Sequence, residues 1–161
     1  MPSDAPAPTA APLIVKIPTP VWVLIFVVAA VALNAVFGWP ALDRLHSLTL
    51  GLIILLLGGA LAAWGRMTFA EAKTQVNPAS VKNNELVTTG PFRFTRNPMY
   101  LGMVIVGFGA AMLGGLAPLY AVPVLTFVLD NFIIIPFEEQ KMERQHGDAF
   151  RAYKRRVRRW I

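Results

Sequence analysis

The sequence contains no cysteine, two histidines and few charged residues. Without cysteine the chain has no disulfide, thiol nucleophile, Cys-ligated zinc or iron–sulfur cluster. His46 and His146 are far apart in the chain, so we expect no histidine-rich site and assign no metal. Charged residues make up 15% of the chain, whereas an ordinary soluble domain has about 25%. With 55% hydrophobic residues and a mean hydropathy of +0.53, the composition predicts a membrane protein.

The length of 161 residues allows one domain. Residues 1–20 contain six prolines, which disfavour regular structure, so we expect a flexible tail over 1–20 and a single membrane domain over 21–161.

Two apolar segments occupy the first half of the domain. No formal charge occurs between Lys16 and Asp43, and Arg44 and Arg66 enclose a second apolar run. Because about 20 apolar residues cross a bilayer, each segment predicts a transmembrane helix.

The second half contains a longer apolar stretch with a turn in it. Between Arg96 and Glu138 the single formal charge is Asp130. One helix over this stretch would be about 60 Å long, twice the hydrocarbon thickness, so the chain must turn, and residues 114–118 are the obvious place. We predict an all-α integral membrane protein with about four spans, at 21–40, 46–65, 99–114 and 118–137, followed by a cytoplasmic amphipathic helix over 138–161.

Basic residues gather in the regions that follow the second and fourth predicted spans. They are Arg66, Lys73, Lys82, Arg93 and Arg96, and then Lys141, Arg144, Arg151, Lys154, Arg155, Arg156, Arg158 and Arg159. The positive-inside rule then places both termini in the cytoplasm. This topology explains the net charge of +6, and we predict no nucleic-acid binding.

Two features of the apolar stretches are informative. Gly107, Ala111 and Gly115 have the spacing that lets membrane helices pack closely. Asp130 and Asn131 lie inside the fourth span, where an ionisable group is costly, so they contact a substrate or make a polar contact such as one with Asn34.

The region before the third span is the richest in special residues. Gly90 and Pro91 predict a turn. Pro98 disfavours helix at Asn97 and suits the first helical turn, where free N–H groups attract a carboxylate. Beyond the fourth span, apolar residues at helical spacing alternate with basic ones, and Gly147-Asp148 is a predicted helix break.

These pieces together form a more specific pattern. Leu86–Phe92, Arg96–Gly102, an apolar hairpin, Glu138-Glu139 and Gly147 follow one another in an order that resembles the isoprenylcysteine carboxyl methyltransferase and phospholipid methyltransferase family, over about residues 45–161. The resemblance implies an integral membrane enzyme that uses S-adenosylmethionine. The cofactor would sit between the loop before the third span and the C-terminal tail. The acceptor would be a lipid or a lipophilic small molecule.

The resemblance also implies roles for particular residues. Glu85, Leu86 and Val87 would line the cofactor pocket, Phe92 would lie near the adenosine, and one glutamate of the 138–139 pair would engage the cofactor. Asn97, Pro98, Met99 and Tyr100 stand at the family's Arg-His-Pro-x-Tyr motif. Arg96, Asp130 and Asn131 are the candidates for substrate contacts, and no general base is assigned.

The chain departs from the family pattern twice, since Asn97 replaces the common histidine and no arginine precedes the glutamates by one turn. The second departure speaks against a prenylcysteine carboxylate as the acceptor. The short form suggests a bacterial inner membrane protein. Three alternatives stay open: an NADPH-dependent reductase of the sterol reductase type, a small transporter that uses Asp130, and a catalytically silent relative.

Overall fold

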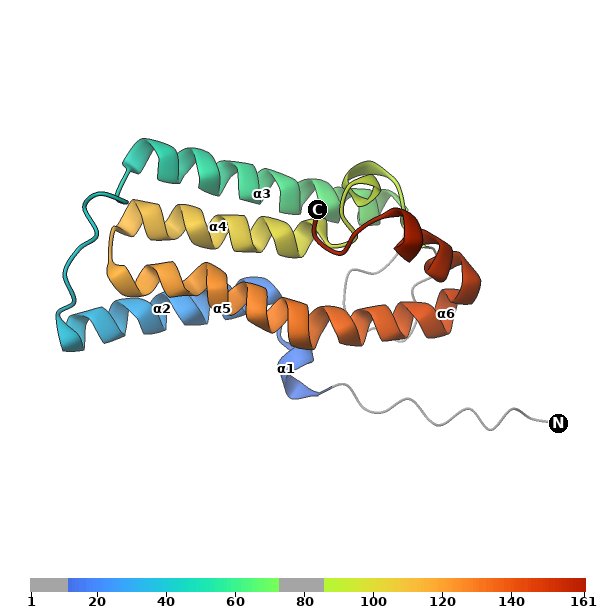
Figure 1. The fold of residues 1–161 in the computed structure, drawn as a ribbon, viewed down its shortest axis with the longest axis horizontal. Helices are drawn as coiled ribbons and strands as arrows, with labels where there is room; N and C mark the ends of the chain where they lie inside the picture. Colours follow the sequence, from blue (N-terminus) through green and yellow to red (C-terminus); the bar gives the residue numbers. More distant parts are fainter. Residues whose placement is uncertain (1–11, 73–85) are drawn as a thin grey trace.

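The computed structural model describes residues 12–72 and 86–161 (Figure 1). In these two ranges every regular element is a helix, and an isolated β-bridge joins Ala41 to Leu116. The α-helices are α1 (Leu13–Lys16), α2 (Thr19–Phe37), α3 (Leu48–Glu71), α4 (Pro98–Gly114), α5 (Ala121–Leu129) and α6 (Ile135–Arg156). Two 3-10 helices, η1 (Gly90–Arg93) and η2 (Ala117–Tyr120), and one π-helix, η3 (Asp130–Ile134), complete the set.

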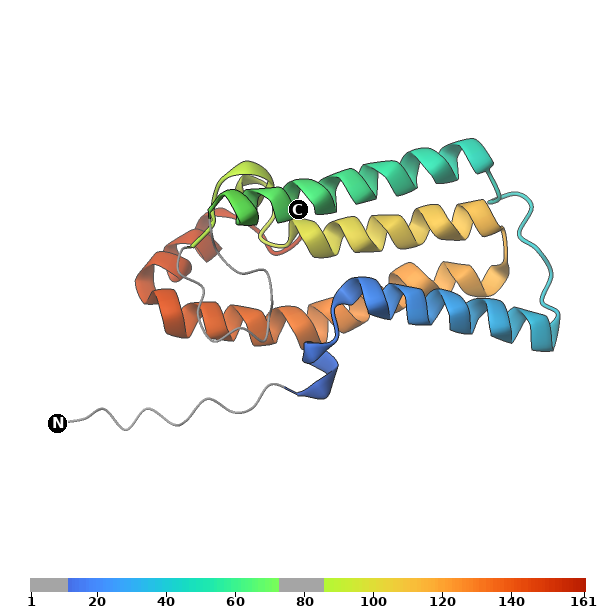
Figure 2. The ribbon, with the colours of Figure 1, turned by 180° about the vertical axis from the view of Figure 1, so that it is seen from behind.

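Four helical segments run along the long axis of the molecule (Figures 1 and 2). Two of them, α2 and α3, and the continuous stretch Ala117–Arg156 are long and apolar enough to cross a membrane, and α4 is a shorter apolar helix. Their outer faces expose apolar side chains such as Leu24 and Leu57, as a surface covered by lipid requires. The predicted all-helical fold is confirmed for the described residues, and three to four apolar helices stand where about four spans were predicted.

The helix ends lie where the sequence places the breaks. Gly38 and Gly115 end α2 and α4 in the left-handed conformation, each with φ of 63°, which glycine adopts without steric cost. The N-terminal boundary differs from the prediction. Residues 1–11 lie outside the described part, but α1 and the first turn of α2 fall within the expected tail over 1–20. Proline is compatible with these helices because Pro20 occupies the first turn of α2, where no N–H partner is lost.

Helices α3 and α4 approach each other closely through glycines. A Cβ atom added to Gly102 would lie 2.6 Å from the Gly58 carbonyl oxygen, and one added to Gly109 would lie 2.5 Å from the Leu55 backbone nitrogen. Gly107 packs in the same way against Pro123 of α5. The predicted packing role is therefore confirmed for Gly107 and Ala111, whereas Gly115 lies just beyond α4 as its C-cap.

Gly102→Ala is expected to destabilise the protein by about 1–3 kcal/mol, because the new methyl group forces α3 and α4 apart. The matched control is Gly59→Ala, since a Cβ at Gly59 meets no atom within 4 Å. Thermal unfolding in detergent measures both. We expect a melting temperature several degrees lower for Gly102→Ala and an unchanged or slightly higher one for the control, because alanine favours helix. Equal melting temperatures would contradict this packing.

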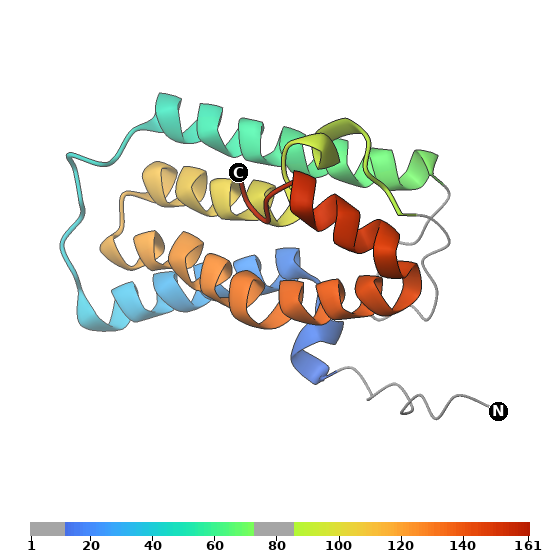
Figure 3. The same ribbon diagram turned by 45° about the vertical axis from the view of Figure 1, so that its right-hand side comes forward.

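The last helix bends back over the bundle (Figure 3). Gly147 interrupts α6 with a non-helical backbone (φ 50°, ψ −120°), and the residues after it run toward the start of α4. The helix break predicted at Gly147-Asp148 is confirmed. The predicted helix over 138–161 is too long, however, because α6 ends at Arg156 and Val157 is extended.

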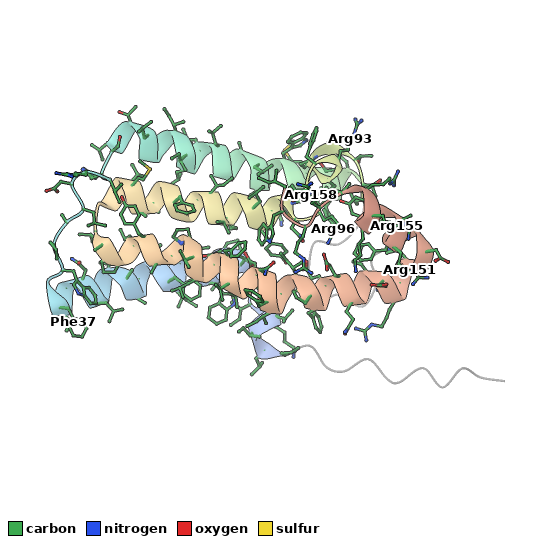
Figure 4. All side chains as sticks on the ribbon, in the orientation of Figure 1. Phe37, Arg93, Arg96, Arg151, Arg155 and Arg158 are labelled. Carbon is green, nitrogen blue, oxygen red and sulfur yellow. The ribbon has the colours of Figure 1, made fainter. Side chains whose placement is uncertain are left out.

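The basic residues gather at one end of the bundle. Arg93, Arg96, Arg151, Arg155 and Arg158 lie there, whereas Phe37 lies at the opposite end (Figure 4). We call the first end the basic end. Both regions that the sequence predicts to face the cytoplasm thus share one end, and the cytoplasmic orientation itself stays a prediction.

Candidate functional site

The segment that precedes α4 is shaped by a glycine and a proline at the basic end. Gly90 has φ of 56°, and a Cβ there would lie 2.7 Å from the Thr68 hydroxyl oxygen. Asn97 then has a non-helical backbone, and Pro98 begins α4. The turn and the helix start are where the sequence predicts them. Glu85, another predicted cofactor contact, lies outside the described residues.

Tyr100 and Glu138 are brought together from α4 and α6. The Tyr100 hydroxyl donates a hydrogen bond of 2.6 Å to the Glu138 carboxylate. Glu138 lies just beyond the apolar residues of the fourth span. Burial raises the pKa of Glu138 to about 7, although the Tyr100 hydrogen bond and the positive charge of Lys141 oppose the rise. The carboxyl group is therefore close to half ionised at neutral pH.

Glu139 has the opposite environment. Arg96 and Arg159 each donate to a different carboxylate oxygen of Glu139, both at 2.6 Å. Burial would raise the pKa of Glu139, but the hydrogen bonds from Arg159 and Arg96 outweigh it and hold the pKa below its usual value. The two adjacent glutamates thus have different environments: Glu139 is an ionised member of an ion-pair network, and Glu138 is a partly ionised carboxyl group beside a phenol.

Residues 157–161, which we call the C-terminal strap, lie across the start of α4. The Arg158 carbonyl accepts from the Arg96 N–H at 3.0 Å. The Arg159 carbonyl accepts from the Thr95 hydroxyl at 3.1 Å and from the Asn97 side-chain amide at 2.9 Å. These contacts join the strap to the segment that leads into α4.

Asn131 and Trp160 fix the other side of the strap. The Trp160 indole N–H donates to the Asn131 amide oxygen at 3.0 Å, and its ring lies 4.9 Å from that of Phe127. The Arg159 side chain also donates to the Asn131 amide oxygen at 3.3 Å. Two predicted substrate contacts, Asn131 and Arg96, are therefore engaged in holding the strap.

Aromatic and aliphatic side chains form a compact cluster beneath the strap. Val87, Phe92, Phe150 and Tyr153 are buried together, with Leu86 and Met99 packed against them. The Tyr153 hydroxyl donates to the Phe92 carbonyl at 2.7 Å. Phe69 meets Phe92 edge to face at 5.0 Å. The cluster contains four of the residues predicted to contact the cofactor, Leu86, Val87, Phe92 and Met99, and their role in binding stays a prediction.

Asp130 is the third predicted substrate contact, and it is fully buried in η3. The Thr19 hydroxyl donates to Asp130 Oδ1 at 3.1 Å, whereas Oδ2 has no partner among the described residues. The alternative that Asp130 contacts Asn34 is not what the structure shows, because the first turn of α2 supplies its partner.

The sequence does not predict the roles of three residues at this end. Arg159 and Trp160 hold the strap, and Thr19 holds Asp130. Arg159 is one of many C-terminal basic residues, and Thr19 stands among prolines in the expected tail. Nothing in their local sequence distinguishes them, because their roles depend on contacts distant in the chain.

Comparison with known proteins identifies a family for this chain. The sequence model of the phospholipid methyltransferase family matches residues 46–149, which is more than half of the chain and includes α3, α4, α5 and most of α6. No curated protein and no solved structure matches the chain. The match contains Tyr100, Glu138 and Glu139, and the chain belongs to the phospholipid methyltransferase family of integral membrane methyltransferases.

Proposed function

We propose that this protein transfers a methyl group from S-adenosylmethionine to a lipid or lipophilic small molecule at the basic end of the bundle. The observation that carries the proposal is the Tyr100–Glu138 pair. Glu138 is a part-buried carboxyl group that accepts a hydrogen bond from one phenol, and it lies next to Glu139, which is paired with two arginines. It suits the binding of a cation.

The residues at this end fit the groups of the cofactor. The Glu138 carboxylate would bind its ammonium group, and the free N–H groups at the start of α4 favour its carboxylate. The aromatic cluster that contains Phe92 offers apolar surface for a flat ring. When bound, S-adenosylmethionine supplies an electrophilic methyl carbon activated by its sulfonium.

The protein's own contribution is to position the reactants and to exclude water. Its three to four apolar helices would place the basic end at the bilayer surface, so an apolar acceptor could arrive through lipid. The C-terminal strap and the second half of α6 cover the start of α4 (Figure 3). A site that holds donor and acceptor in line accelerates methyl transfer mainly by removing their freedom of motion.

Calorimetric titration of the purified protein with S-adenosylhomocysteine, and with NADPH in parallel, tests the proposal. We expect binding of S-adenosylhomocysteine and none of NADPH. A folded sample that binds neither would contradict the proposal, and binding of NADPH alone would favour a reductase. Radiolabelled methyl transfer into a lipid extract then identifies the acceptor class.

The affinity for S-adenosylhomocysteine is expected to rise between pH 6 and pH 8. The pKa of Glu138 is raised to about 7, so the ionised fraction grows about tenfold over this interval, and only the ionised form attracts the ammonium group. Titrations at the two pH values should differ by up to about tenfold in Kd. Glu138→Gln should remove the difference, and a pH dependence that persists in this variant would assign it to another group.

A further inference from the structure

The segment before α4 and the end of α6 are joined by hydrogen bonds at the basic end. The Tyr153 hydroxyl donates to the Phe92 carbonyl at 2.7 Å, and the Arg96 guanidinium donates to the Val157 carbonyl at 2.6 Å. The Arg96 backbone N–H also donates to the Arg158 carbonyl, at 3.0 Å. Two segments that are distant in the chain therefore lie side by side on one surface.

Three exposed arginines lie on this surface. They are Arg93 in η1, Arg155 in the last turn of α6 and Arg158 in the C-terminal strap, and all three are at the basic end (Figure 4). Tyr153 is buried in the cluster with η1, so Arg155, two positions later on the helix, faces away from that cluster. We call Arg93, Arg155 and Arg158 the arginine patch.

The arginine patch lacks a counter-charge within the described part of the chain. None of its three members makes an ion pair there. The ion pairs of Glu139 and Glu143 on α6 use other basic residues. Positive charges that repel one another are thus held on one surface by the backbone contacts around them, and a bound anion would offset that repulsion.

An apolar rim borders the arginine patch. Phe94 follows Arg93 directly and is 71% exposed, and Trp64 and Met67, near the end of α3, are 48% and 60% exposed. The start of η1 adjoins this part of α3, because a Cβ added to Gly90 would lie 3.4 Å from the Trp64 indole nitrogen. Exposed aromatic rings beside basic residues suit the headgroup level of a bilayer. A soluble anion would not contact this rim, so the two features together indicate a lipid.

Membrane topology alone does not explain the arrangement of the arginine patch. The positive-inside rule requires basic residues on one side of the membrane but no particular arrangement of them. Here residues from both sides of the α4–α6 hairpin converge, and all three are arginines. A guanidinium group binds a phosphate through two parallel N–H groups, which the ammonium group of lysine cannot do.

We propose that the arginine patch and its apolar rim bind the phosphate group of an anionic phospholipid, whose acyl chains lie along the exposed face of α3. This lipid is a bound partner of the protein and is distinct from the methyl acceptor. The site uses none of the residues assigned to the cofactor, so it stands or falls independently of the proposed function.

Native mass spectrometry of the protein in detergent, titrated with phosphatidylglycerol or with diacylglycerol of identical acyl chains, tests the proposal. Identical chains make the apolar contacts equal, so the difference in Kd reports the phosphate. The wild type should bind phosphatidylglycerol about fivefold more tightly, since one basic residue near an anionic lipid surface contributes about 1 kcal/mol, which is that fold-change. This preference should nearly disappear at about 1 M salt, where the Debye length is about 3 Å.

The variant Arg93→Gln/Arg155→Gln/Arg158→Gln should lose the preference and keep its affinity for diacylglycerol. Arg158→Gln alone should weaken phosphatidylglycerol binding about two- to fivefold. Its matched control is Arg44→Gln, which removes one exposed charge from the connection after Phe37, at the opposite end of the bundle, and should change nothing (Figure 4).

Two results would overturn the proposal. Equal wild-type Kd values for the two lipids would exclude a phosphate site, even if the triple variant does not fold. A preference that persists in a folded triple variant, with a melting temperature near that of the wild type, would place the phosphate elsewhere. Glycerol phosphate distinguishes the source of the phosphate: it should not displace phosphatidylglycerol at equal concentration, and displacement would assign the patch to a soluble ligand instead of a lipid.

Discussion

Glu139→Gln is expected to lower the free energy of unfolding by about 3 kcal/mol, because it leaves two arginines at the basic end without a counter-charge. The side chains of Glu139 and Arg96 are only 12% and 11% exposed. Glutamine keeps one oxygen acceptor but has no charge, so the guanidinium groups of Arg96 and Arg159 would keep only neutral partners such as the Val157 carbonyl and the Asn131 amide oxygen. The strap, which Arg159 anchors, should come loose first.

Chemical unfolding in mixed micelles measures the global effect, and digestion by carboxypeptidase measures release of the strap. Glu143→Gln is the matched control on the same helix, since Glu143 pairs with Arg151 and Lys154 at the surface and should contribute less than about 1 kcal/mol. A Glu139→Gln protein as stable and as resistant to digestion as this control would refute the network's structural role.

Acid provides an independent check on Glu139. Its pKa is held below the usual value of 4.5, so its stabilising effect is present above that pH and is lost as the pH falls through the lowered pKa. The Glu139→Gln protein should therefore lose less stability than the wild type in this acidic window.

The sequence predicts the spans well because their signal is local. Uncharged stretches, together with Gly38 and Gly115, are sufficient to locate most helix ends within a few residues. What the sequence does not predict is the boundary near Thr19, because the prolines that suggest a tail are equally suited to the first turn of a helix.

The candidate site also has one part that the sequence predicts and one part that it does not. The residues that carry the family pattern, such as Tyr100 and Glu138, are indicated by the family resemblance, and the structure brings these two into contact. The different environments of Glu138 and Glu139 cannot be predicted from the sequence. They depend on the ion pair between Arg159 and Glu139, and Arg159 is distant in the chain from both Arg96 and Asn97. A basic tail looks like a membrane anchor in sequence, and only the folded chain shows it bound to the start of α4.

Glu138→Gln is expected to weaken binding of S-adenosylhomocysteine about 10- to 100-fold, the largest effect that we predict on ligand binding. A hydrogen bond to a charged group contributes about 1.5–3 kcal/mol, and glutamine cannot supply the charge. Its amide oxygen can still accept from the Tyr100 hydroxyl, which donates to Glu138 at 2.6 Å, so the α4–α6 contact should survive. The melting temperature should consequently change little.

Tyr100→Phe is the complementary variant because it removes the donor of the Tyr100–Glu138 hydrogen bond. Loss of the phenol removes the hydrogen bond that lowers the pKa of Glu138, so that pKa should rise further and cofactor binding should require a higher pH. The affinity at pH 8 should fall less than in Glu138→Gln. If both variants bind S-adenosylhomocysteine within about twofold of the wild type, Glu138 does not contact the cofactor, and the aromatic cluster around Phe92 would have to be tested as a structural core.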